Sequence, residues 1–275
     1  MGGNRGRGGA GLLVALLMAA FALFRYYGSS QVNTVTGEKQ RVAGISAQQE
    51  IALGLQAAPQ MQQRHGGPSQ NAQARALVAA VGEKIARGSD AAKTPYQYNF
   101  TLLDDDKTVN AFALPGGQIF MTDALASRFK TEGQFAGVLA HEAGHVIARH
   151  GAEHIAKQQL TQGLTGAAVL ATYDPNNPST QRSAAVLAAI GQLVNLKYGR
   201  EDELEADRLG VRLMAQAGYD PRSLIQVMEV LKASGGGGRQ PEFFSSHPNP
   251  ENRIQRIQEA IKKEFPGGVP AGLKP

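Results

Sequence analysis

One predicted helix constrains the fold more than any other feature, because it carries three ionisable side chains in an otherwise apolar segment. Apolar residues at positions 135, 138 and 139 lead into the run His141-Glu142-Ala143-Gly144-His145. Burying polar and charged groups is costly unless they find partners, so such a helix needs a chemical purpose. We therefore expect a fold that packs this helix in its core and brings further polar groups to it.

The spacing of the two histidines predicts a metal site. His141 and His145 are four residues apart and project from one helical face. Neutral imidazoles suit zinc, and a catalytic zinc keeps one position for water. Glu142 lies about 100° around the helix from His141, where its carboxylate can reach such a water without ligating the metal. We predict that both histidines bind zinc and that Glu142 is the general base.

A rival pattern follows closely. His150-Gly-Ala-Glu153-His154 fits the inverted zinc motif His-x-x-Glu-His. Gly151 weakens the helix there, and the segment is more polar than the one before it. We interpret Glu153 and His154 as surface residues, and expect His150 by itself to pack or hydrogen-bond near the site.

A third protein ligand is expected from the acidic segment at residues 201–207. Glu203 and Asp207 are four residues apart and so share a helical face. Glu203 can ligate zinc, while Asp207 can hold a ligand histidine through its free ring nitrogen. Glu205 is the rival ligand and faces away from Glu203. The alternative interpretation is a solvated acidic first turn, which the helix dipole favours.

The N-terminus resembles an export signal. The apolar run Gly11–Phe24 follows Arg5 and Arg7 and precedes Arg25. This pattern is typical of a secretory signal, whereas a transmembrane helix usually needs about 20 apolar residues. No small-x-small cleavage site is evident. We therefore favour an uncleaved signal-anchor in the inner (cytoplasmic) membrane, with the catalytic domain on the periplasmic side; the alternative is a soluble periplasmic protein after signal cleavage.

Charge and cysteine content exclude other classes. The formal net charge is +5, but three of the positive charges flank the apolar run, and no basic stripe interleaved with aromatic residues follows. We therefore expect no nucleic-acid partner. The absence of cysteine excludes a disulfide framework, thiolate metal sites and a cysteine nucleophile.

The remaining pattern predicts a predominantly helical α+β domain over residues 46–265. It follows a signal or anchor over residues 1–30 and a linker over residues 31–45, and it precedes a disordered tail over residues 266–275. Capping boxes at Ser46 and Thr131 open two of its helices. Three short strands are expected to form a small antiparallel sheet, at residues 96–102, 109–114 and 118–122. Further helices are predicted at residues 69–87, 183–197, 201–217, 220–233 and 249–261.

Four motifs occur in a fixed order: Asn110-Ala111-Phe112-Ala113-Leu114-Pro115-Gly116-Gly117-Gln118-Ile119-Phe120, His141-Glu142-Ala143-Gly144-His145, Glu203-Leu204-Glu205-Ala206-Asp207 and Ser246-His247-Pro248. In these motifs the sequence resembles the HtpX-like and CAAX-prenyl-protease-like zinc metallopeptidases, most closely their small periplasmic BepA-like and LoiP-like branch. The resemblance covers about residues 32–262. The chain ends soon after its last predicted helix, so functions of the helical-repeat domain of BepA-like members are not expected here.

The resemblance implies a zincin-like (gluzincin) fold with one zinc ion per subunit, bound by His141, His145 and Glu203, and with Glu142 as the base. Asp207 matches the helper aspartate of the family. The segment at residues 110–117 matches its edge strand beside the cleft, and an exposed strand edge is a template for an extended peptide. The plain alternative for this segment is a hairpin whose glycines serve only the turn.

Two further residues enter through the resemblance. In similar proteins a histidine at the place of His247 lies near the metal, where it either stabilises the oxyanion or occupies the open zinc position and holds the enzyme inactive. Arg253 matches a recurring basic residue and is the other oxyanion candidate. The implied function is a zinc metalloendopeptidase acting on misfolded or misassembled cell-envelope proteins. The alternative is a chaperone-like module that holds unfolded strands and cleaves rarely.

Overall fold

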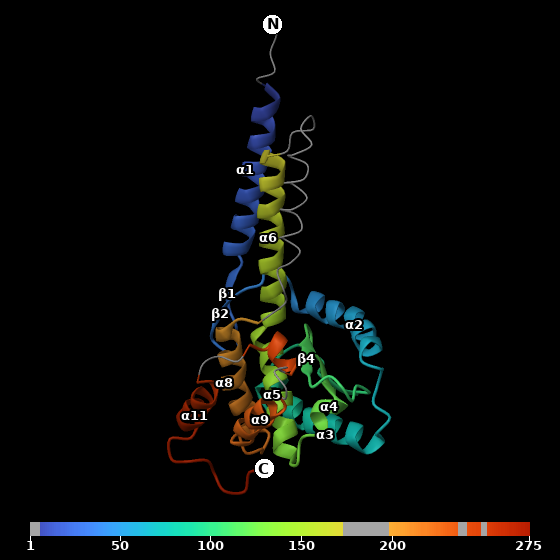
Figure 1. Ribbon diagram of the computed structural model, residues 1–275. Coiled ribbons are helices and arrows are strands. Elements are labelled where there is room, and N and C mark those ends of the chain that lie inside the picture. Colours follow the sequence, from blue (N-terminus) through green and yellow to red (C-terminus); the bar gives the residue numbers. More distant parts are fainter. Residues whose placement is uncertain (1–5, 173–197, 236–240, 249–251) are drawn as a thin grey trace. The chain divides into compact units, whose positions relative to one another are not determined.

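The computed structural model describes residues 6–172, 198–235, 241–248 and 252–275. Helices dominate the described chain and two small sheets accompany them (Figure 1), which confirms the predicted α+β class. The described residues form two compact units. Among the described residues, one comprises residues 6–32, 39–45 and 152–172, and the other comprises residues 33–38, 46–151, 198–235, 241–248 and 252–275. Residues 152–172 are thus grouped apart from the rest of the domain predicted over residues 46–265.

The apolar N-terminal run forms helix α1 (Gly6–Tyr27) in the first unit. Many of its large apolar side chains are exposed, namely Leu12, Leu13, Val14, Leu16, Leu17, Met18, Phe21, Leu23, Phe24 and Tyr27. Within the described part of the chain, no helix combines the length and the mean hydropathy needed to cross a bilayer.

The linker predicted over residues 31–45 is instead a β-hairpin. Strands β1 (Ser30–Val32) and β2 (Lys39–Arg41) pair antiparallel. Just beyond β2, Val42 and Ile45 bury their side chains against Ala152 of helix α6 (His150–Thr172). This small apolar cluster packs the end of the predicted linker against α6.

The second unit is built around helix α5 (Glu132–Ala148), in which every residue from Gly133 onward is buried. The side-chain oxygen of Gln134 accepts hydrogen bonds from the backbone N–H groups of Lys130 and Thr131, at 2.6 and 3.2 Å. This is the returning half of the predicted capping box. Helix α8 (Arg200–Gln216) packs along α5.

The sheet of the second unit has the strand order β3-β5-β4, from β3 (Asn99–Leu103), β4 (Ala111–Leu114) and β5 (Gln118–Thr122). The β4–β5 hairpin is antiparallel, as predicted, but β3 runs parallel to β5, so the sheet is mixed. The connection at residues 104–110 carries the chain past β5, which leaves β5 between the other two strands and β4 at an edge.

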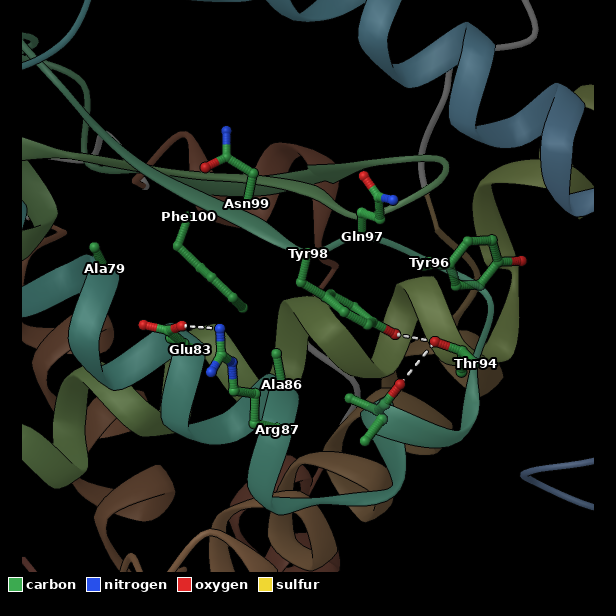
Figure 2. A pocket seen from close by; sticks show the side chains of 12 residues that line it. Ala79, Glu83, Ala86, Arg87, Thr94, Tyr96, Gln97, Tyr98, Asn99 and Phe100 are labelled. Atoms are coloured by element: carbon green, nitrogen blue, oxygen red, sulfur yellow. Dashed lines mark hydrogen bonds and ion pairs between the residues drawn. The ribbon is translucent and has the colours of Figure 1, made fainter.

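Two helices cover the faces of this sheet. Helix α2 (Ala47–Arg64) begins with the predicted capping box, since Ser46 and Gln49 exchange hydrogen bonds, and its Ala58 packs on one face. Helix α3 (Ala72–Gly88) packs on the other. A groove of about 500 Å³ lies between α3 and β3 (Figure 2).

The remaining elements are the 3-10 turn η1 (Asp90–Lys93), α4 (Asp123–Ala126), α9 (Ser223–Ala233), α10 (Phe243–Ser246) and α11 (Arg253–Glu264). The helix predicted over residues 183–197 lies outside the described residues. The tail predicted as disordered over residues 266–275 is held at its end. The Lys274 carbonyl accepts a hydrogen bond from the Asp220 N–H at 2.9 Å, and its ammonium lies 2.5 Å from Glu132. Backbone pairing and one ion pair hold this tail, and neither leaves a hydrophobic pattern in the sequence.

Candidate active site

Small residues let α5 and α8 approach each other closely. A Cβ atom on Gly144 would lie 3.0 Å from the carbonyl oxygen of Ala206, and one on Gly210 would lie 3.4 Å from the Cα of His141. Larger side chains at either position would push the helices apart. The close approach brings Glu203 and Asp207 of α8 to the histidines of α5.

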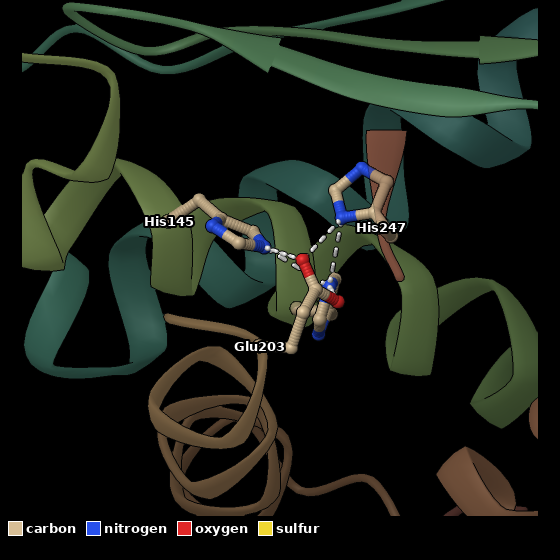
Figure 3. Close-up of side chains that lie close together, drawn as sticks. His145, Glu203 and His247 are labelled. Carbon is tan, nitrogen blue, oxygen red and sulfur yellow. Dashed lines mark hydrogen bonds and ion pairs between the residues drawn. The ribbon is translucent and has the colours of Figure 1, made fainter. Parts of the chain in front are cut away.

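Four buried side chains, His141, His145, Glu203 and His247, offer ligand atoms that lie within 4.8 Å of one another. Figure 3 shows His145, Glu203 and His247 pointing toward one another. The Nε2 atoms of the two α5 histidines are 3.1 Å apart. The Glu203 carboxylate oxygens lie 3.5 Å from Nε2 of His141 and 3.4 Å from Nε2 of His145. Nδ1 of His247 is 3.0 Å from Glu203 Oε1. Donors bound tetrahedrally to zinc at 2.0–2.1 Å are about 3.3 Å apart, so this donor set fits the ion.

Glu142 lies beside this cluster and is fully buried. Neither of its carboxylate oxygens has a hydrogen-bond partner among the described residues, although His247 Nε2 approaches Oε1 to 3.5 Å. Burial raises the pKa of the Glu142 carboxyl, and the nearby His247 and His141 only partly oppose this. A carboxylate in this setting is a stronger base than one in water.

His141 is held from behind by a charged network. Its Nδ1 lies 2.9 Å from Asp207 Oδ1, as predicted for that carboxylate. Arg253 donates to the same carboxylate from Nε and Nη2, at 2.7 and 2.9 Å, and its Nη2 lies 3.2 Å from Glu203 Oε2. Burial lowers the pKa of His141, but the hydrogen bonds to Asp207 and Glu203 outweigh burial and raise it to about 9. The structure thus places Arg253 against Asp207, with Nη2 also 3.5 Å from Nε2 of His141.

His145 is held by another histidine. Its Nδ1 lies 2.9 Å from Nδ1 of His150, and Nε2 of His150 lies 3.5 Å from Glu205 Oε2. Burial holds the pKa of His145 well below its usual value. His150 and Glu205, the alternative ligands, therefore lie on the far side of His145 from the other donors: His150 contacts His145, and Glu205 contacts His150. Glu153 accepts a hydrogen bond from the Arg41 N–H.

Two aromatic residues flank the cluster, and the sequence alone did not single them out. The Tyr198 ring stacks on His145 with 4.0 Å between ring centroids. Phe243 stacks on His247 at 4.4 Å. Both precede a predicted site residue by four or five positions in the chain, but an isolated aromatic residue carries no metal-site signal.

The predicted edge strand lies at a sheet edge. Asn110 is buried, and its carbonyl accepts a hydrogen bond from the Thr122 N–H at 3.0 Å. Residues 112–115 are half-buried, and Gly116 and Gly117 turn the chain with φ of +82° and +106°. Phe243, which begins the short helix before His247, donates its N–H to the carbonyl of Val109 at 3.2 Å. The entry to β4 is therefore tied to the loop that carries His247.

Comparison with known proteins gives a consistent picture. The family model for peptidase family M48 matches residues 72–261. The chain is similar to the beta-barrel assembly-enhancing protease of Escherichia coli (strain K12), with 32% identity over 64% of this chain and 37% of the relative. It is also similar to the mitochondrial metalloendopeptidase OMA1 of Schizosaccharomyces pombe, with 37% identity over 56% of this chain and 44% of the relative. The chain thus spans less than half the length of these relatives.

Proposed function

The chain belongs to peptidase family M48, and on this basis we propose that it is a zinc-dependent metalloendopeptidase. One observation carries the proposal: Glu142 is buried, without a hydrogen-bond partner among the described residues, beside a set of donors with zinc-like spacing. A purely structural zinc site needs no such carboxylate.

Three residues are proposed as the zinc ligands. His141 and His145 present Nε2 to the site, and Glu203 presents its carboxylate. Zinc bound there lowers the pKa of a water molecule and polarises a carbonyl group. Asp207 accepts a hydrogen bond from Nδ1 of His141, which fixes the tautomer that leaves Nε2 free to ligate.

Glu142 is proposed as the general base. Its carboxylate takes the proton of the attacking water as that water adds to the peptide carbonyl, and then gives the proton to the leaving nitrogen. Groups in this role contribute typically about 10²–10⁴-fold to the rate. The raised pKa of Glu142 suits both steps, because the carboxylate has to accept the proton and the carboxylic acid has to release it.

His247 is proposed to occupy the fourth donor position and to hold the enzyme inactive. Its Nδ1 lies 3.4 Å from Nε2 of His141 and 3.0 Å from Glu203. An open catalytic site would keep this position for water. Cleavage then requires His247 to leave this position, which also fits a protein that holds unfolded chains and cleaves intermittently.

The proposed substrates are extended segments of misfolded or misassembled cell-envelope proteins. The position of β4 at a sheet edge supports this, because an extended peptide can add to a free edge by backbone hydrogen bonding. The name of the Escherichia coli relative, a beta-barrel assembly-enhancing protease, points in the same direction.

We also propose that α1 attaches the protein to the inner membrane, with the peptidase on the periplasmic side. The exposed apolar side chains of α1, and Arg5 and Arg7 before the apolar run in the sequence, support this. Membrane fractionation of the full chain, before and after an alkaline carbonate wash, tests it. Recovery in the soluble fraction before the wash contradicts membrane attachment.

The catalytic proposal is tested by comparing the wild type with Glu142→Gln on casein, with the zinc content of both proteins measured. We expect both to bind zinc and only the wild type to cleave. Equal cleavage by both would show that Glu142 is not the base. The ligands are tested with His141→Ala and Glu203→Ala, and if both variants keep their zinc, the proposed ligands are wrong. His247→Ala then separates its two roles: faster cleavage supports the plug, and slower cleavage a part in catalysis.

A further inference from the structure

A buried ion pair connects the end of the zinc-site helix to helix α2, which packs against the turn that follows the edge strand. We infer that Glu50 and Arg149 are positioning residues, which set the place of β4 relative to Glu142 and so govern the binding of extended substrates. The inference rests on the proposed function, since it assumes that β4 is the strand to which the substrate adds.

The ion pair is well partnered on both sides. Arg149 donates from Nε to Glu50 Oε1 at 2.7 Å, and its Nη2 contacts the same oxygen. The Tyr96 hydroxyl donates to the other oxygen of Glu50 at 3.2 Å. In Figure 2 this hydroxyl points away from the neighbouring Tyr98. Glu50 is 1% exposed, so water does not compete for these contacts.

The backbone of Arg149 shows that the pair is built into the fold. Arg149 caps the C-terminus of α5 with φ of +63°, in the left-handed region. Glycine usually occupies such a position because it has no Cβ atom to clash. An arginine here accepts backbone strain, and in return its guanidinium reaches α2. Glu142 lies seven residues earlier on the same helix, about two turns away.

Three glycines bring α2 and the start of α6 against the turn after β4. A Cβ atom on Gly54 of α2 would lie 2.0 Å from the carbonyl oxygen of Pro115. One on Gly116 would lie 2.4 Å from the Cα of Ile51, and one on Gly151 would lie 3.0 Å from the Pro115 ring. The turn therefore packs between α2 and the start of α6, and the Glu50–Arg149 pair joins α2 to the residue that precedes α6.

These contacts form one mechanical connection. It runs from Glu142 along α5 to Arg149, across the ion pair to α2, and from Gly54 to Pro115, the first residue after β4. Weakening any of these contacts shifts β4 relative to Glu142 and leaves the zinc donors unchanged. Interactions made equally in the bound substrate and in the transition state affect KM and leave kcat unchanged. A purely structural ion pair would instead change stability alone.

The test compares three variants. Glu50→Gln removes the charge of the pair, and Gly54→Ala disturbs the grip on Pro115 while leaving the pair intact. Asp90→Asn is the matched control, because Asp90 is a buried carboxylate whose Oδ2 lies 2.9 Å from Arg212 Nε, and it contacts neither the turn nor a zinc donor. Binding of fluorescein-labelled β-casein is measured in the Glu142→Gln background, and KM and kcat in the active enzyme.

We expect Glu50→Gln and Gly54→Ala to weaken β-casein binding and to raise KM by about tenfold, because a displaced strand edge loses one or two backbone hydrogen bonds to the extended chain. Zinc content and kcat stay at the wild-type values, and Asp90→Asn binds like the parent. If Glu50→Gln does not fold, the β-casein binding and the KM of Gly54→Ala decide whether the inference holds. Unchanged binding in the folded variants, or an equal loss in Asp90→Asn, overturns the inference alone. A wild type whose cleavage does not depend on Glu142 overturns the proposed function, and the inference with it.

Discussion

The two histidines of α5 face the same point but are held in opposite ways. His141 is backed by a carboxylate, Asp207, which is itself held by two hydrogen bonds from Arg253. His145 is backed by His150, a neighbour from the start of the next helix. The pKa of His141 is raised to about 9 although burial opposes this, whereas burial holds the pKa of His145 well below its usual value.

The difference shows which parts of the chain the metal site depends on. The carboxylate behind His141 and its arginine come from α8 and α11, so the C-terminal helix supports a ligand that lies 112 residues earlier. The support for His145 is local, five residues away. A charged acceptor orients an imidazole and strengthens it as a donor more than a neutral one does. We therefore expect the two supports to contribute unequally.

The largest effect is expected for Asp207→Asn. The amide keeps the shape of the side chain but removes the carboxylate to which buried Arg253 donates two hydrogen bonds, so that Glu203 is its remaining ion-pair partner. Losing one partner of a buried pair costs about 3–5 kcal/mol of stability. The zinc affinity should fall by about 100-fold, since His141 loses its charged acceptor. Denaturant unfolding and zinc competition against a chelator measure the two losses.

The pH dependence provides the control for this variant. Burial acts to raise the pKa of Asp207, but Arg253 and His141 outweigh it and hold the pKa below its usual value. A carboxylate with a lowered folded-state pKa stabilises the protein above its unfolded pKa of about 3.9, and this stabilisation is lost as the pH falls further. The stability difference between zinc-free wild type and Asp207→Asn should therefore shrink below about pH 4. A difference that stays constant down to pH 2 would contradict a charged Asp207.

Zinc removal comes next in size. A ligand present at 100 times its dissociation constant stabilises the folded state by about 2.7 kcal/mol, so chelation of the wild type should lower its melting temperature measurably. Asp207→Asn, which binds zinc weakly, should respond less at the same zinc concentration. Scanning calorimetry with and without chelator measures both. An equal response from both proteins would mean that Asp207 does not support the ion.

His150→Ala should have a smaller effect than Asp207→Asn. His145 loses one imidazole partner, while Asp207, Arg253 and Glu203 keep theirs, so we expect the zinc affinity to fall by about tenfold with little loss of stability. His150→Gln, which keeps an acceptor oxygen, should recover part of the affinity. Chelator competition measures all three proteins. A loss as large as that of Asp207→Asn would remove the distinction between the two supports.

The sequence predicted the site better than its surroundings. His141, His145 and Glu203 could be identified because helical spacing turns sequence distance into a shared face, and the structure brings them together. His150 and Glu205 appeared only as rival ligands, because no spacing rule shows that one imidazole lies behind another. The grouping of Arg253 with Asp207 likewise depends on how α11 packs against α8, which no local pattern encodes.

The fold shows the same limit. The β4–β5 hairpin followed from its turn residues, but the parallel pairing of β3 with β5 did not, since it depends on where a seven-residue connection returns the chain. The hairpin of β1 and β2 was missed because its strands are three residues long and mostly exposed, and the apolar residues that pack beside it, Val42 and Ile45, lie beyond β2. Periodicity reports which side of an element is buried, and leaves open which partner buries it.

Glu205→Gln sharpens the comparison at its weakest point. Glu205 Oε2 is 3.5 Å from Nε2 of His150, at the limit of a hydrogen bond, and its side chain is 19% exposed, so water competes for the contact. Partly exposed charge pairs contribute only about 0–1 kcal/mol, and the zinc affinity should change by less than about threefold. Chelator competition beside His150→Ala measures the difference. If both variants lose the same affinity, the Glu205 carboxylate supports His145 through His150. Both ligand histidines would then depend on a carboxylate, one that contacts His141 directly and another that reaches His145 through one intervening imidazole.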